Sequence, residues 1–151
     1  MRYLGNRDPR LRFCLLLDLP DAAHAEAPGD VAIRDAARAA IETLNRKYVH
    51  ERSFDAVDED GAPQQVRERI EPFLLLVRAR TFSESEQAWI GRERRRGQLH
   101  DLNAWLCGAH ERFAFSAGNT GGATEIRYVI ALDADTGLPR DGARSLAAAM
   151  V

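Results

Sequence analysis

Two aspartates one residue apart, Asp133 and Asp135, are the residues of this sequence best suited to chemistry. They follow an apolar run that predicts a buried strand over residues 126–132. Ligands of an open α/β sheet gather at the carboxyl ends of its strands. Two carboxylates placed there can hold a divalent cation, Mg²⁺ or Mn²⁺, against a diphosphate. The alternative is that Asp133 and Thr136 only form a turn before the last helix; the position directly after the apolar run favours the functional interpretation.

A basic segment forms the second candidate feature. Arg94, Arg95 and Arg96 stand beside Gly97 near the start of a predicted helix. Arginines there can grip phosphate oxygens, and the amides of a helix N-terminus would add to that grip. Taken alone, the segment is better explained as a solvated basic face. The functional interpretation gains because the segment precedes the aspartates by one helix and one loop.

The elements that must position these residues alternate along the chain. Strands are predicted over 11–18, 73–77 and 126–132. Helices are predicted over 31–46, with Asp30 as its N-cap, over 92–106, and from Pro139 and Asp141 to the C-terminus. Residues 50–61 are expected to form a loop, and short helical stretches are expected between Pro63 and Pro72 and from Ser83 or Ser85 through Ile90. The order β-α-β-α-β-α predicts an α/β fold with a parallel sheet covered by helices.

Composition excludes several classes of protein. The chain has 151 residues and a formal net charge of −2, which gives no reason to expect nucleic acid or an anionic membrane as a partner. No apolar stretch reaches the length of a membrane span, so we expect a soluble chain that does not cross a membrane. Cys14 and Cys107 lack the spacing of metal ligands and are expected to be buried thiols.

The order of the two candidate features resembles processive glycosyltransferases of the GT-A fold. Those enzymes carry a basic-x-Gly-x-Leu motif before the strand that bears Asp-x-Asp, and residues 95–99 and 133–135 match the two motifs. More specifically, the chain resembles the glycosyltransferase part of cyclic β-1,2-glucan synthases. Four stretches, which together cover most of the chain, carry this resemblance: 5–13, 36–48, 89–103 and 127–140.

The resemblance implies a membrane-embedded bacterial enzyme whose catalytic region lies at the cytoplasmic face of the inner membrane. It implies transfer of glucose from UDP-glucose to a growing β-1,2-glucan, with a divalent metal and with inversion at the anomeric carbon. Carried over to this sequence, Asp133 would contact the nucleotide side of the donor, and Asp135 the metal and the diphosphate. Arg95 would stand near the donor, and Asp18 would touch the uracil or the ribose.

Some features depart from the family pattern. Arg92 stands where an aromatic residue is expected, Gln98 where lysine is expected, and residues 51–65 fit poorly. We expect residues 1–151 to form a partial glycosyltransferase domain, the donor-binding half, with an incomplete, mainly parallel, Rossmann-like GT-A sheet that lacks its first strand. The acceptor half and a general base are expected to be absent, so the chain alone is expected to be inactive. Exposed sheet edges predict self-association or a rearranged sheet.

Two other interpretations compete with this one. Residues 130–136 also match the Asp-x-Asp-x-Thr motif of haloacid-dehalogenase-like phosphatases, in which Asp133 would be the nucleophile and Asp135 the general acid. Such enzymes need a lysine downstream, and no lysine follows Asp135. The other alternative is a non-catalytic interaction module, in which the basic helix, Trp89 and Trp105 would form a partner surface.

Overall fold

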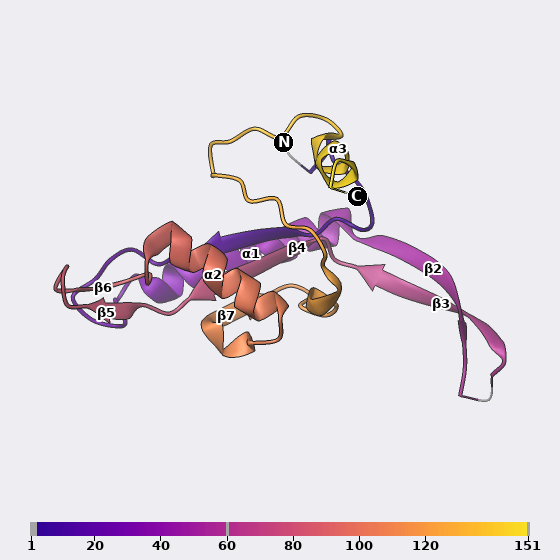
Figure 1. Cartoon of the computed structure of the whole chain (residues 1–151). Coiled ribbons are helices and arrows are strands. Elements are labelled where there is room, and N and C mark those ends of the chain that lie inside the picture. The colour runs from indigo at the N-terminus through magenta and orange to yellow at the C-terminus, as the bar shows by residue number, and fades with distance from the viewer. Residues whose placement is uncertain (1–2, 60, 151) are drawn as a thin grey trace.

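The computed structural model describes residues 3–59 and 61–150, and only the backbone of Arg52 and Phe54. This part of the chain has a mixed α/β architecture (Figure 1). Its α-helices are α1 (Asp30–Tyr48), α2 (Arg94–Leu106) and α3 (Gly142–Ala148). Its strands are β1 (Phe13–Leu17), β2 (His50–Val57), β3 (Pro63–Ile70), β4 (Phe73–Arg78), β5 (Thr81–Ser83), β6 (Ala88–Ile90) and β7 (Phe113–Ala117). Short 3-10 helices η1 (His110–Arg112) and η2 (Ala123–Glu125) complete it.

The central sheet has three strands in the order β1-β4-β7. Strands β1 and β4, both predicted from their apolar runs, pair in parallel, with Phe13 opposite Phe73. Strand β7, which the sequence did not reveal, pairs with β4 in the antiparallel sense. The sheet is therefore mixed, and the prediction of a mainly parallel sheet is confirmed only for the β1–β4 pair. The outer strands of this sheet are β1 and β7.

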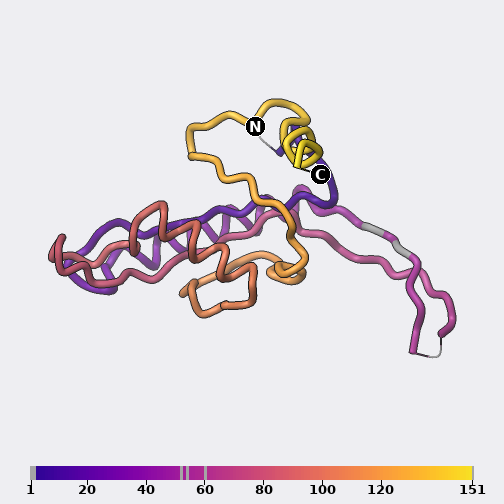
Figure 2. Tube along the Cα trace, in the orientation of Figure 1, coloured from indigo at the N-terminus to yellow at the C-terminus, as the bar shows by residue number. Residues whose placement is uncertain are grey.

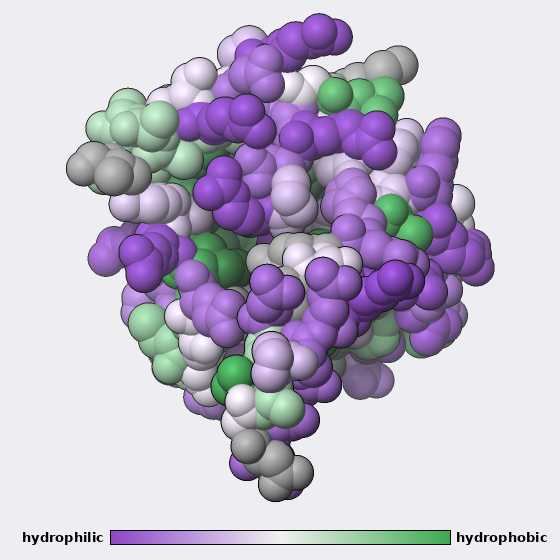
Figure 3. All heavy atoms as spheres, turned by 90° about the vertical axis from the view of Figure 1, so that its right-hand side faces the viewer, coloured by the Kyte–Doolittle hydropathy of each residue, from purple (hydrophilic) through white to green (hydrophobic). Residues whose placement is uncertain are grey.

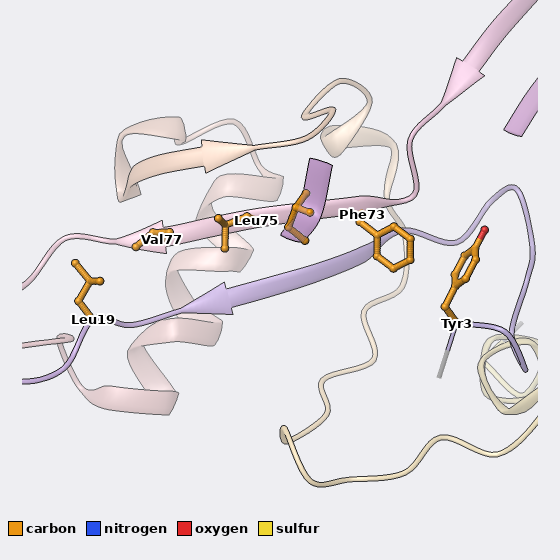
Figure 4. Packing of buried hydrophobic residues seen from close by; sticks show 6 residues of the cluster. Tyr3, Leu19, Phe73, Leu75 and Val77 are labelled. Atoms are coloured by element: carbon orange, nitrogen blue, oxygen red, sulfur yellow. The ribbon is translucent and has the colours of Figure 1, made fainter. Parts of the chain in front are cut away.

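Strand β4 is the centre of the hydrophobic core. Its six residues are all buried, and Leu75 and Leu76 have no exposed surface. Because side chains alternate along a strand, Phe73, Leu75 and Val77 pack on the α1 side, and Leu74 and Leu76 pack against α2 (Figure 4). Burying one such side chain contributes about 1.5–3 kcal/mol. The sheet is thus covered by α1 on one face and α2 on the other, as predicted.

The strand predicted over residues 126–132 is not formed. The segment has no regular secondary structure and pairs with no strand in the described part of the chain, and Tyr128 and Val129 are 43% and 46% exposed. A strand needs a partner that takes up its backbone hydrogen bonds. Both edges of β4 are already occupied, one by β1 and the other by β7. The segment also pairs with neither outer strand, β1 or β7, so the strand predicted from the apolar run is wrong.

A long hairpin replaces the loop and the helical turns predicted for residues 50–70. Strands β2 and β3 pair along their whole length, from His50 opposite Ile70 to Val57 opposite Pro63, and extend away from the sheet (Figures 1 and 2). The turn is closed by Asp58, whose side chain accepts a hydrogen bond from the Ala62 amide at 2.8 Å. Polar residues on both faces hid this hairpin, since charge is typical of loops as well as of solvated strands. The side of the molecule nearest the hairpin is mostly hydrophilic (Figure 3).

The helical stretch predicted around residue 89 is a second hairpin. Strands β5 and β6 place Phe82 opposite Trp89, and their rings pack with centroids 5.8 Å apart. The backbone of Trp89 also bridges to Ala22, which ties the hairpin to the chain after β1. The prediction of buried thiols was wrong as well, because Cys14 lies on the outer strand β1, Cys107 follows the end of α2, and both are exposed.

The N-terminal turn packs against the C-terminal helix. Asn6 donates to the carbonyl of Pro139 and accepts from the amide of Ala143, both at 2.9 Å, and Asp141 donates its amide to Gly5. Helix α3 is confirmed where the sequence predicted it, and these contacts fix the end of the segment that carries the two aspartates. Within the described residues, no helix is both long and apolar enough to span a membrane.

Candidate functional site

The carboxyl ends of the parallel strands β1 and β4 carry a buried arginine and an aspartate. Asp18 follows β1, and Arg78 is the last residue of β4. The guanidinium of Arg78 donates to both carboxylate oxygens of Asp18, from Nε and from Nη2, each at 2.7 Å. Its Nη1 donates to Asp101 of α2 at 3.0 Å. The sheet and the helix are therefore joined by one charged side chain at the edge where α/β proteins bind ligands.

Arg78 is almost completely enclosed, with 2% of its side chain exposed. Burial by itself would lower the pKa of the guanidinium, but the hydrogen bonds and charges of Asp18 and Asp101 outweigh burial and raise the pKa above its ordinary value. Arg78 is accordingly charged at any pH at which the protein is folded. Removing one partner of such a buried pair leaves an uncompensated charge, which is strongly unfavourable.

The basic segment lies directly over this arginine. Glu93 and Arg94 both have left-handed backbone conformations, with φ of 50° and 47°. Non-glycine residues rarely adopt this conformation, so surrounding contacts must hold it. Two glycines of the segment allow the close packing, since a Cβ on Gly91 would meet Asp18 at 2.6 Å and a Cβ on Gly97 would meet the Arg92 carbonyl oxygen at 1.9 Å.

The structure brings the two candidate features together. Arg95, in the first turn of α2, forms an ion pair with Asp133. Both side chains are more than half exposed, at 52% and 58%. Asp135 is also exposed and lies in a turn that the Thr136 amide closes by donating to the Asp133 carbonyl at 3.1 Å. The aspartates thus occupy a solvent-facing turn beside the basic helix start, and not the end of a strand.

The predicted site residues lie in two layers, one at the surface and one partly buried beneath it. Arg95, Asp133 and Asp135 lie on the surface, whereas Asp18 lies beneath, with 26% of its side chain exposed. Asp18 is paired with Arg78, so its carboxylate already has a structural partner. Residues 91–95 connect the two layers. The carbonyls of Arg92 and Arg94 accept hydrogen bonds from Arg78 below, and the side chain of Arg95 pairs with Asp133 at the surface.

The two aspartates suit one kind of metal site only. In the described part of the chain, no three histidine, cysteine or acidic side chains gather as metal ligands. Mg²⁺ is commonly bound by one or two carboxylates together with phosphate oxygens of the substrate and water. Asp133 and Asp135 are exposed, and Asp133 is paired with Arg95, so a cation at this turn would need its remaining oxygens from a ligand such as a diphosphate. They do not form a site that would hold a cation by itself.

Sequence reasoning missed Arg78, Asp101 and a second buried pair, Arg80–Asp30. Arg80 donates to both oxygens of Asp30, at 2.6 and 2.7 Å, and to the carbonyls of Pro20 and Ala25. A signal was present, because Arg78 directly follows five apolar residues of a buried strand and Arg80 comes two residues later. An arginine there must find acceptors, since buried charges need partners.

The competing interpretations lose support from the structure. Trp105 is 4% exposed and belongs to the core beneath α2, whereas Trp89 packs in the β5–β6 hairpin. The two tryptophans therefore do not form one partner surface. The phosphatase motif requires Asp133 at the end of a strand, and residues 126–132 do not form one. The same finding removes the strand-end argument for a cation site at the aspartates, which leaves the pairing of Arg95 with Asp133 as the structural observation there.

A layered sheet with a basic helix start and two acidic side chains at one end is typical of α/β proteins that bind phosphate-bearing ligands. No protein-family model matches the chain. Over 146 residues, or 97% of its length, the chain is 34% identical to the cyclic β-(1,2)-glucan synthase NdvB of Rhizobium meliloti (strain 1021). The chain belongs to that family as a segment, and it spans 4% of the length of this relative.

Proposed function

We propose that this chain is the donor-binding part of a glycosyltransferase that moves glucose from UDP-glucose to a growing β-1,2-glucan, with inversion and with Mg²⁺ or Mn²⁺. The observation that carries the proposal is the ion pair between Arg95 and Asp133, because it places the basic motif and the acidic motif side by side. The relationship to a glucan synthase supplies the choice of a sugar donor. The layered sheet is consistent with an incomplete GT-A fold.

The residues of the site have distinct roles in this proposal. Asp133 faces the nucleotide side of the donor, and Asp135 shares the cation with the diphosphate. Arg95 exchanges its contact with Asp133 for a diphosphate oxygen, to which its planar guanidinium can donate two hydrogen bonds. Asp18 would approach the uracil or the ribose through the part of its side chain that remains exposed. When bound, the cation neutralises charge that develops on the leaving diphosphate.

Several functions of the proposed enzyme depend on parts of the protein other than this chain. We propose that the parent protein is held at the cytoplasmic face of the bacterial inner membrane. We also propose that other parts of it bind the glucan acceptor and supply the general base. We therefore expect no glucan synthesis by the 151-residue chain alone. The open outer edges of β1 and β7 also lead us to expect self-association, which light scattering would measure.

Titration of the chain with UDP in the presence of Mn²⁺, followed by calorimetry, tests the donor site. We expect binding that depends on the metal and that falls about tenfold or more in Arg95→Ala and Asp135→Asn, since each removes a charged contact to the ligand. Arg96→Ala is the matched control, because Arg96 lies one residue further along the same helix turn and is 90% exposed. We expect it to retain UDP affinity within about threefold.

Two outcomes would contradict the proposal. A wild-type chain that binds neither UDP nor UDP-glucose with either metal has no donor site. Equal losses in Arg95→Ala and Arg96→Ala would show that only the general positive charge of the helix attracts the nucleotide.

A further inference from the structure

Arg78 uses every hydrogen-bond donor of its side chain. A guanidinium has five N–H groups, and Arg78 directs them to five acceptors. Three bonds go to the carboxylates of Asp18 and Asp101, and the other two go to the backbone carbonyls of Arg92 and Arg94, each at 3.0 Å. The two carbonyls belong to the residues on either side of Glu93, so Arg78 holds the backbone of the basic segment both before and after Glu93.

The gripped backbone is the strained part of the segment. Glu93 and Arg94 have positive φ, a conformation that persists only where neighbouring groups determine it. Gly91 and Gly97 lie against the same guanidinium, and a Cβ on either would approach an Arg78 nitrogen to 2.9 Å. The contacts of Arg78, together with the ion pairs of the exposed Arg94 side chain with Glu86 and Asp21, hold the chain from Gly91 into the first turn of α2.

The path of this backbone decides where Arg95 stands. Arg95 follows the gripped residue Arg94 directly, and its side chain reaches Asp133. We propose that Arg78 is a positioning residue of the donor site: it contacts no ligand, and it holds residues 91–94 so that Arg95 lies beside Asp133. This inference rests on the proposed function, because it assigns Arg78 to the site in which Arg95 and Asp133 bind the donor.

A neighbouring arginine provides a matched control. Arg80 is as deeply buried as Arg78, with 2% of its side chain exposed, and it also forms a bidentate pair with an aspartate. Its two carbonyl acceptors, however, belong to Pro20 and Ala25, which lie between β1 and α1. Loss of either guanidinium removes a buried bidentate pair with an aspartate, but only Arg78 donates to the backbone of the basic segment. Arg80 reaches that segment only indirectly, because Asp21 in the loop that Arg80 holds accepts a hydrogen bond from the exposed Arg94 side chain.

The test compares Arg78→Lys with Arg80→Lys in the 151-residue chain. Lysine keeps the positive charge but cannot reach five separated acceptors, because its ammonium is a single point with three donors. Two measurements are made on each folded variant: amide hydrogen exchange by segment, and the affinity for UDP with Mn²⁺. We expect Arg78→Lys to speed exchange over residues 91–96 and to weaken UDP binding about tenfold or more. We expect Arg80→Lys to speed exchange over residues 20–27 and to keep UDP affinity within about threefold.

Each result decides a separate point. Unchanged exchange over residues 91–96 in Arg78→Lys would overturn the claim that Arg78 holds the segment, whatever the nucleotide does. Unchanged UDP affinity in a variant whose segment is loosened would overturn the link to the donor site. If the two variants lose UDP affinity equally, the loss reflects general destabilisation, and the link between Arg78 and the donor site is again overturned. A wild-type chain that binds no UDP removes the proposed function and the donor role of Arg78, and hydrogen exchange then decides only the structural claim.

Discussion

Two arginine–aspartate contacts meet in the same segment of the chain, and they differ in what surrounds them. The Arg78 contacts are buried, share one guanidinium among five acceptors, and join β1, β4 and α2. The Arg95–Asp133 contact is more than half exposed and joins the start of α2 to a surface turn. A buried guanidinium with several acceptors holds the secondary-structure elements together, and losing one partner is costly. An exposed pair contributes little to stability and is accessible to a ligand.

The largest expected effect separates the two contacts by stability. Arg78→Ala should lower the free energy of unfolding by about 3–5 kcal/mol, because Asp101 loses its buried arginine partner and, of its two arginines, keeps only the more distant Arg112, at 4.0 Å. Arg95→Ala should lower it by less than about 1 kcal/mol, as is usual for exposed ion pairs. Urea denaturation followed by tryptophan fluorescence measures both values. Similar losses in the two variants would remove the distinction between scaffold and surface contact.

A smaller effect is expected from the glycine that packs against the buried arginine. Gly97→Ala should destabilise the chain by about 1–3 kcal/mol, because the new methyl group would overlap the Arg92 carbonyl and force the segment to move. Gly137→Ala is the control, since Gly137 has open space where the methyl group would lie, and its effect should stay within about 0.5 kcal/mol. Denaturant midpoints of the two variants give the comparison, and a neutral Gly97→Ala would show that the segment is not tightly held.

The second buried pair predicts a dependence of stability on acid. Hydrogen bonds from Arg80, and then from the Ala27 amide, lower the pKa of Asp30 from 3.8 to about 2. Between these values the unfolded chain binds more protons than the folded chain, so stability falls as the pH drops through that window and is unaffected by Asp30 above it. Urea midpoints measured at pH 7, 4, 3 and 2 should show this fall. The slope between pH 4 and 2 should flatten in Asp30→Asn and persist in Asp133→Asn; a wild-type chain with no such slope would contradict the pKa.

The reliable predictions from sequence were those that depend on local patterns of residues. Continuous apolar runs identified β1 and β4. Only β4 is buried throughout, as expected of a strand covered on both faces, whereas Cys14 and Leu15 of the outer strand β1 are exposed. Helical spacing of Ile41 and its neighbours identified α1. The basic helix start and the aspartates were recognised by residue type, and the structure places Arg95 against Asp133.

Other elements could not be predicted because their partners are distant in sequence. The hairpin β2–β3 depends on pairing between strands whose polarity resembles a loop, and β7 depends on an edge of β4 that no local pattern reveals. The run at 126–132 has the composition of a strand, but composition does not provide a neighbouring edge. Arg78 illustrates the same limit for the site, since its acceptors lie 60, 23, 14 and 16 residues away.

The sequence by itself determined the apolar strands β1 and β4, the three helices, the chemical types of the candidate site and the relationship to the glucan synthase family. These properties follow from composition and from periods of two or 3.6 residues, which neighbouring side chains specify. Only the tertiary structure decided that β4 takes β1 and β7 as neighbours, that the aspartates lie in an exposed turn, and that Arg78 holds the basic segment. Those outcomes depend on which donors and acceptors meet when the chain packs, and burial makes each such pairing obligatory.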